Sequence, residues 1–139
     1  MTDRHFHMRL DCNYQSTDKA PVDLVVEIFT DGAWLAFEPS LETPGFLLFV
    51  YALFSCQLRY MRVNSVERCF VLQSTSGELT LIADADWVAQ SVQVDFRSQL
   101  THGMPCDDDI AYIRKRMMHC PVSTNLPACV VMNNSVVFT

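Results

Sequence analysis

The sequence predicts one α+β domain, in which runs of antiparallel strands are separated by two helices. Segments rich in β-branched or alternating hydrophobic residues come before, between and after two stretches of helical pattern. This order is typical of α+β domains rather than of alternating α/β domains. The 139 residues, half of them hydrophobic, suit a single domain over residues 1–139, because a domain commonly takes about 100–200 residues.

Three strands are expected in the N-terminal part of the chain. His5–Cys12 fits a first strand, and the β-branched segment Asp23–Thr30 fits a second. Asp31-Gly32 is a tight-turn signal of the hairpin kind. Ala33–Phe37 is therefore expected to return beside the second strand.

A long helix is expected next, from Phe46 to about Arg62. Thr43 can cap this helix and Pro44 suits its first turn. Hydrophobic side chains cover the whole circumference as far as Cys56, which is typical of a helix buried on all sides. Because one sheet covers only one side of a helix, we expect a second copy of the chain to cover the rest, in an intertwined homodimer.

Three more strands are expected after this helix. Val66–Gln73 and Glu78–Ala83 fit two strands, with a turn over Ser74–Gly77 between them. Hydrophobic and polar residues alternate strictly over Ser91–Arg97. That alternation predicts a half-buried antiparallel strand.

A second helix and a last strand complete the predicted domain. Pro105 precedes the helix, and the carboxylates of Asp107–Asp109 suit the positive end of the helix dipole. Capping explains these three carboxylates, so no calcium site is predicted. The helix is expected to end at Cys120-Pro121, and Val130–Phe138 to close the sheet.

The charge balance and the cysteine content narrow the function classes. A net charge of −6 and a pI near 5.0 argue against a nucleic-acid partner, because phosphate backbones attract basic surfaces. The longest apolar run, Phe46–Cys56, is shorter than the roughly 20 residues that cross a bilayer. Six cysteines with no signal-peptide pattern do not describe a secreted disulfide scaffold. We therefore expect a cytoplasmic protein with free thiols.

Two cysteines are candidates for chemistry. Cys56 lies late in the apolar helix, where burial raises the pKa of a thiol, so its reactivity would require a neighbouring cation. Pro121 disfavours helical geometry in the residue before it, which places Cys120 where the second helix stops. The other four cysteines have no partner motif and fit inert positions: Cys12, Cys69, Cys106 and Cys129.

This pattern resembles the OsmC/Ohr family, named for osmotically inducible and organic hydroperoxide resistance proteins. The resemblance rests on a cysteine late in an apolar helix, a second cysteine 64 residues later, and the segment Cys120-Pro-Val-Ser123 at a helix end. It covers about Thr43 to Leu126 and implies an OsmC-like fold, with antiparallel sheets around the central helix of a homodimer.

The resemblance also implies a chemistry for the two cysteines. Cys56 would be the peroxidatic cysteine, which attacks the O–O bond of a hydroperoxide and becomes a sulfenic acid. Cys120 would resolve that acid as a disulfide, and an external thiol reductant would reopen it. The apolar helix favours an organic hydroperoxide over hydrogen peroxide as the substrate.

The sequence departs from the family pattern at the start of the helix. Family peroxidases carry a glutamate about ten residues before the first cysteine, where this chain has Phe46 and Leu47. They also hold the thiolate with an N-terminal arginine, and Arg4 and Arg9 lie in no recognisable motif here. The alternative hypothesis is a non-peroxidatic OsmC-like protein that binds a small apolar or thiol ligand or senses redox state.

Other sites and folds fit the sequence less well. His5, His7, His119 and Cys120 include ligand types that zinc accepts, but no paired metal-ligand spacing accompanies them. With four glycines and no glycine-rich phosphate loop, no cofactor is predicted. A hot-dog domain, often an acyl-thioester hydrolase, would leave the Cys-Pro helix end unexplained and would lack a helix-borne carboxylate.

Overall fold

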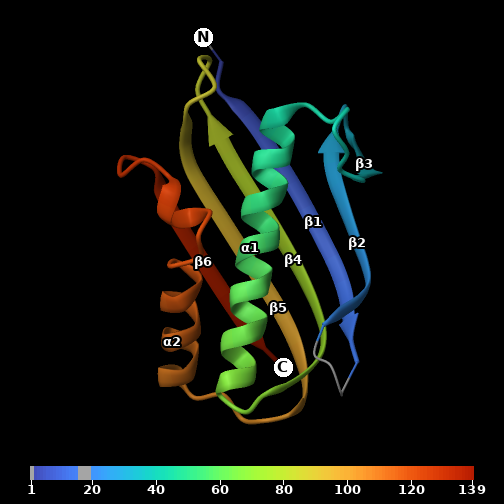
Figure 1. Ribbon diagram of the computed structural model, residues 1–139, viewed down its shortest axis with the longest axis vertical. Helices are drawn as coiled ribbons and strands as arrows, with labels where there is room; N and C mark the ends of the chain where they lie inside the picture. Colours follow the sequence, from blue (N-terminus) through green and yellow to red (C-terminus); the bar gives the residue numbers. More distant parts are fainter. Residues whose placement is uncertain (1, 16–19) are drawn as a thin grey trace.

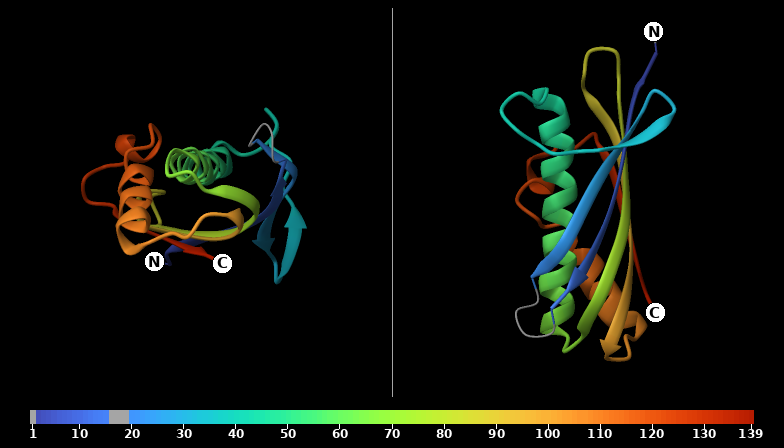
Figure 2. Two further views of the ribbon diagram at one scale, coloured as in Figure 1. Left: turned by 90° about the horizontal axis from the view of Figure 1, so that it is seen from below. Right: turned by 90° about the vertical axis from the view of Figure 1, so that its right-hand side faces the viewer.

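The computed structural model describes residues 2–15 and 20–139. Their strands form one six-stranded sheet in the order β3-β2-β1-β4-β5-β6. Both helices, α1 and α2, lie on the same face of this sheet (Figure 1, Figure 2). The predicted α+β class is therefore confirmed.

The N-terminal strands follow the prediction closely. β1 (Arg4–Tyr14), β2 (Pro21–Thr30) and β3 (Ala33–Ala36) are antiparallel neighbours. Asp31 and Gly32 join the last two strands with φ angles of 50° and 81°. A two-residue hairpin turn of this kind requires positive φ at both positions, which confirms the predicted turn.

The two longest strands, β4 (Val71–Ala83) and β5 (Ala89–His102), form the centre of the sheet beside β1. The predicted turn over Ser74–Gly77 is wrong, because these residues continue β4 without interruption. Thr75 faces the core, where its hydroxyl lies 2.7 Å from that of Ser98. The polar residues that suggested a turn thus pair across two central strands.

Gly77 has a packing role in β4 rather than a turn role. It pairs with Phe96 of β5, and the Phe96 ring lies directly over it. A Cβ atom at Gly77 would come within 2.5 Å of that ring. Phe96 in turn stacks on Phe54 of α1, with ring centroids 5.9 Å apart, so the missing side chain at Gly77 leaves space for the contact between sheet and helix.

The last strand differs from the expected antiparallel arrangement. β6 (Val131–Phe138) pairs with β5 in parallel, so the sheet is mixed. The connection between them contains α2 (Asp107–Met117) and a 3₁₀ turn, η1 (Ser123–Asn125). A crossover that contains a helix brings the chain back to the end of the sheet at which it started, and the next strand is then parallel.

The long helix α1 (Gly45–Glu67) is displaced from its predicted bounds. Pro44 is its N-cap residue, whereas the Thr43 hydroxyl accepts the Ser40 N–H at 3.0 Å and does not cap the helix. The helix continues past Arg62, because Ser65 and other inward residues of its last turns remain buried. The start of the predicted Val66–Gln73 strand is therefore helical.

The helix α1 is long and apolar enough to cross a membrane. Core helices of soluble proteins meet the same two criteria. Its inner face packs on the sheet, with buried residues at helical spacing: Val50, Leu53, Phe54, Gln57, Leu58 and Met61. Phe46, Leu47 and Leu48 are only half-buried. No described element of the chain covers the outer side of α1 (Figure 2), so the predicted burial on all sides still depends on a second copy of the chain.

The short helix α2 begins as predicted and ends three residues early. The Asp109 carboxylate accepts the backbone N–H of Cys106 at 3.1 Å, which caps the first turn. Ile113 and Met117 are fully buried. The helix ends at Met117 rather than at Cys120-Pro121, and a turn carries the chain through both residues.

We expect Gly77→Ala to destabilise the fold by about 1–3 kcal/mol, the usual cost of overpacking a core. Urea denaturation measures the effect. Gly45→Ala is the matched control, because no atom lies within 4 Å of a Cβ placed there. Equal stability of both variants would contradict the close approach of Phe96 to Gly77.

Candidate functional site

The two predicted cysteines meet where the end of α2 approaches α1. Cys56 is a half-buried residue of α1, and Cys120 is fully buried in the turn between α2 and η1. Both are free thiols. Each thiol influences the pKa of the other, so the fold places the two side chains close together.

A glutamine that the sequence analysis did not single out lies beside this pair. Gln57 is fully buried, and its Nε2 donates to the Met117 carbonyl at 2.7 Å and to Ser123 Oγ at 2.8 Å. The same Nε2 lies 3.3 Å from Cys120 Sγ. The one available signal was an amide directly after Cys56 in an otherwise apolar run, since a buried amide requires partners.

The Cys-Pro-Val-Ser segment folds back on its own cysteine. Ser123 Oγ lies 2.9 Å from Cys120 Sγ, and the Ser123 backbone N–H donates to the same sulfur at 3.3 Å. The Pro121 carbonyl accepts the Asn125 side-chain amide at 2.7 Å, which holds the turn closed. The segment that carried the family resemblance thus surrounds one sulfur with donors.

The environment moves the pKa values of the two thiols in opposite directions. Burial raises the pKa of Cys56 to about 11, and the Val122 N–H and the Arg59 guanidinium only partly offset it. Burial acts in the same direction on Cys120. Hydrogen bonds from Ser123, Cys56 and Gln57 outweigh it and lower the Cys120 pKa. The buried thiol is therefore the more acidic member of the pair.

An aromatic cluster occupies the start of α1, where the resemblance had implied a glutamate. The Phe46 ring lies 4.9 Å from Phe6 and 5.3 Å from Trp87, between ring centroids. The Arg4 guanidinium lies over Trp87 at 4.0 Å, and Arg9 pairs with Glu27 at 2.8 Å. The contacts of both arginines thus lie away from the two thiols.

The candidate metal ligands do not gather. No group of three His, Cys, Asp or Glu side chains within residues 2–15 and 20–139 could hold a metal ion. His7 lies against Trp34, with ring centroids 4.7 Å apart, and 3.6 Å from Glu78. His119 Nδ1 lies 2.8 Å from the Lys115 carbonyl oxygen. These contacts give His7 and His119 a structural partner each.

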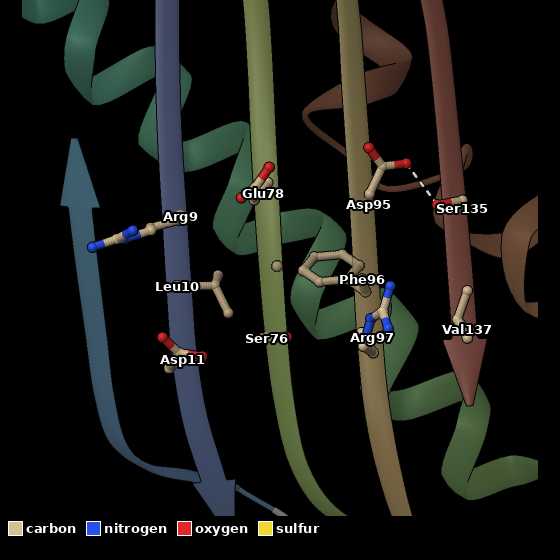
Figure 3. Close-up of a pocket in the computed structure, with 11 residues that line it drawn as sticks. Arg9, Leu10, Asp11, Ser76, Glu78, Asp95, Phe96, Arg97, Ser135 and Val137 are labelled. Carbon is tan, nitrogen blue, oxygen red and sulfur yellow. Dashed lines mark hydrogen bonds between the residues drawn. The ribbon is translucent and has the colours of Figure 1, made fainter. Parts of the chain in front are cut away.

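The opposite face of the sheet carries a shallow hollow of about 430 Å³, to which neither thiol contributes. Figure 3 shows its side chains on four neighbouring strands, with α1 behind them. Asp95 accepts hydrogen bonds from Ser135 at 2.6 Å and from Gln93 at 2.7 Å. Arg9, Glu78 and Asp95 pair with their own neighbours, so we interpret this surface as the solvated face of the sheet.

Neither models of known protein families nor curated proteins match the sequence. Solved structures match the fold. An OsmC-like hydroperoxide resistance protein from Jannaschia sp. CCS1 is 16% identical with a TM-score of 0.57, over 88% of this chain and 86% of that one. An OsmC-like protein of unknown function from Vibrio cholerae is 13% identical with a TM-score of 0.53, over 92% of this chain and 97% of that one. An OsmC-like protein from Mycoplasma pneumoniae is 10% identical with a TM-score of 0.51, over 98% of this chain and 96% of that one.

We expect Gln57→Leu to lower the free energy of unfolding by about 1–3 kcal/mol, because it removes the side-chain donor of the Met117 carbonyl and of the Ser123 hydroxyl. Gln93→Leu on the exposed sheet face is the control and should stay within about 0.5 kcal/mol of the wild type. Urea denaturation of the two variants measures the difference. Equal stabilities would contradict a structural role for the Gln57 amide.

Proposed function

We propose that this chain, which has the OsmC-like fold, is a thiol-dependent reductase of organic hydroperoxides that uses Cys56 and Cys120 as its redox couple. The observation that carries the proposal is a pair of free thiols that influence each other's pKa, beside a buried amide and a serine hydroxyl. One thiol of the pair has a lowered pKa, as a nucleophile requires.

The proposed cycle needs both sulfurs and an external reductant. A thiolate attacks the O–O bond, forms a sulfenic acid and releases an alcohol. The second thiol then condenses with the sulfenic acid to give a disulfide and water. A dithiol of the lipoyl type or another thiol reductant restores the pair, as expected in a reducing cytoplasm. The family resemblance assigns the first attack to Cys56, but the proposal for the pair holds for either order.

Apolar side chains near the start of α1 favour a greasy substrate. Phe46, Phe49 and Tyr51 are half-buried and pack at the edge of the core. They lie one to three helical turns before Cys56. An alkyl or aryl hydroperoxide gains free energy by covering such surface, whereas hydrogen peroxide does not.

A second copy of the chain is the proposed cover for the outer side of α1. Leu48 is half-buried there, and Val63 is 38% exposed. Apolar side chains on this side favour association, because burial of apolar surface is the main driving force of most protein contacts. The half-buried Cys56 would lie at the edge of this interface.

The alternative is a non-peroxidatic protein that binds a small apolar or thiol ligand or responds to redox state. Two observations favour it. The pKa of Cys56 is raised to about 11, and Phe46 belongs to an aromatic cluster where family peroxidases carry a carboxylate. The oxidation experiment below separates the two functions.

We expect the reduced protein to consume cumene hydroperoxide faster than hydrogen peroxide, and to form a Cys56–Cys120 disulfide after one equivalent. Cys56→Ser and Cys120→Ser should each lower turnover by roughly 100-fold or more, since the two residues act as a unit. Dihydrolipoamide-coupled turnover and peptide mass spectrometry measure these effects.

Cys129→Ser is the matched control, because Cys129 is exposed and takes part in none of the described hydrogen bonds of the Cys120 sulfur. Its turnover should equal that of the wild type. If both candidate thiols stay reduced while exposed cysteines oxidise at random, the enzyme hypothesis fails and the alternative stands. Equal rates with the two peroxides would contradict the apolar substrate.

We expect the chain to sediment at twice its mass of 15.9 kDa. Leu48→Asp should shift the species toward the monomer, because it places a charge on the outer side of α1. Leu41→Asp is the control, since Leu41 is fully exposed and should leave the mass unchanged. A monomeric wild type in analytical ultracentrifugation would contradict the homodimer.

A further inference from the structure

We propose that a hollow between α1 and α2, beside Cys56, binds the carboxylate of a small organic molecule, which Arg59 and Arg116 hold between them. This inference rests on the proposed function for one point, namely that the bound molecule takes part in the reaction at Cys56. Two reactants of that reaction can supply the carboxylate, the hydroperoxide and the thiol reductant.

The hollow lies along the line where α1 and α2 pack side by side (Figure 1). Its volume is about 210 Å³. Pockets that hold drug-sized ligands have about 300–1,000 Å³, so this hollow suits a small molecule or one group of a larger molecule. Residues of both helices line it: Arg59, Tyr60, Val63, Asn64, Glu67 and Arg116.

The wall that α1 contributes continues the helix stripe of Cys56. Residues three and four positions apart are neighbours on a helix surface, so Arg59 and Tyr60 follow Cys56 by one turn. Val63 and Asn64 follow by two turns. The charge of Arg59 acts on the half-buried Cys56 thiol. A molecule in the hollow therefore lies about one helical turn from Cys56.

A buried amide holds the Arg116 guanidinium at the hollow. Asn64 is 2% exposed, and its Nδ2 donates to the Tyr60 carbonyl at 2.7 Å. The Asn64 Oδ1 then accepts from Arg116 Nε at 3.4 Å. The terminal nitrogens of Arg116 have no hydrogen-bond partner among the described residues. They remain available to a carboxylate, which a guanidinium binds with charge-assisted hydrogen bonds.

The charges around the hollow do not cancel. Within residues 2–15 and 20–139, neither Arg59 nor Arg116 forms an ion pair with a carboxylate. Glu67 also lines the hollow, and its carboxylate accepts the Tyr112 hydroxyl at 3.1 Å. Two positive charges and one negative charge leave a net charge of +1. A singly charged carboxylate matches this balance better than a phosphate dianion does.

Two apolar walls suit the carbon part of such a molecule. Val63 is 38% exposed and Tyr60 is half-buried. Apolar groups gain free energy by covering such surface, so an acid with an alkyl or aryl body fits the hollow. Val63 belongs to the side of α1 for which a second copy is the proposed cover, so in that dimer the hollow lies at the edge of the interface.

Binding of 4-isopropylbenzoate, an acid that does not react with thiols, tests the site without any peroxide. We expect the backbone amide NMR signals of Arg59, Asn64 and Arg116 in the whole reduced chain to shift and saturate. The neutral isostere 4-isopropylbenzamide should bind at least about tenfold more weakly, because it loses the charge-assisted hydrogen bonds.

Two charge-removing variants connect this binding to the arginines. Arg59→Gln and Arg116→Gln should each weaken binding of the acid by about tenfold. Lys115→Gln is the matched control, because it removes the same charge from α2 and Lys115 does not line the hollow. Equal affinities of all three variants and the wild type would overturn the role of the two arginines.

Matched pairs of reactants identify the source of the carboxylate. One pair is cumene hydroperoxide and its 4-carboxy derivative, and the other is dihydrolipoamide and dihydrolipoate. We expect kcat/KM to be at least about tenfold higher for the acid of one pair, and this preference to be lost in Arg116→Gln but kept in Lys115→Gln. Equal kcat/KM within both pairs would overturn the link between the hollow and the reaction.

The two experiments separate a failure of the site from a failure of the proposed function. A wild type that reduces hydroperoxides but does not bind the acid overturns the site alone. A chain that binds the acid but reduces no hydroperoxide overturns the proposed function and keeps the site. If the wild type does not bind the acid and both arginine variants become monomeric, the arginines hold the second copy and the proposal fails.

Discussion

The buried amide of Gln57 is the interaction on which the thiol site depends. An amide removed from water requires hydrogen-bond partners, and its nitrogen finds the Met117 carbonyl, the Ser123 hydroxyl and the Cys120 sulfur. These partners come from the end of α2 and from the turn after it. One side chain of α1 therefore fixes the position of the turn and also sets the electrostatics of its cysteine.

The sheet places this amide by fixing the position of α1. Phe96 lies over Gly77 and stacks on Phe54, so the inner face of the helix is determined by a close approach to β4 and β5. Helical periodicity then turns Gln57 inward with Phe54, while Cys56 remains half-buried toward the outer side. The unequal burial of the two thiols is a consequence of this packing.

Neutral groups surround the Cys120 sulfur. At the start of α1, Phe46 packs with Phe6 and Trp87, and Arg4 lies over the indole ring. An amide, a hydroxyl and a backbone N–H gather instead at Cys120. Such donors stabilise a thiolate without the desolvation cost of burying a cation.

Local patterns in the sequence determined the α+β class, the Asp31-Gly32 hairpin, and the choice of Cys56 and Cys120 as candidates. Hydrophobic periodicity, turn propensity and proline sterics carry this information because each acts over a few residues. Only the tertiary structure decided that β6 is parallel, that Ser74–Gly77 stays in a strand, and that the Gln57 amide lies against the Cys120 sulfur. Each of these depends on contacts between segments distant in the chain. The charge on a sulfur depends on its neighbours in space, and a linear pattern does not record them.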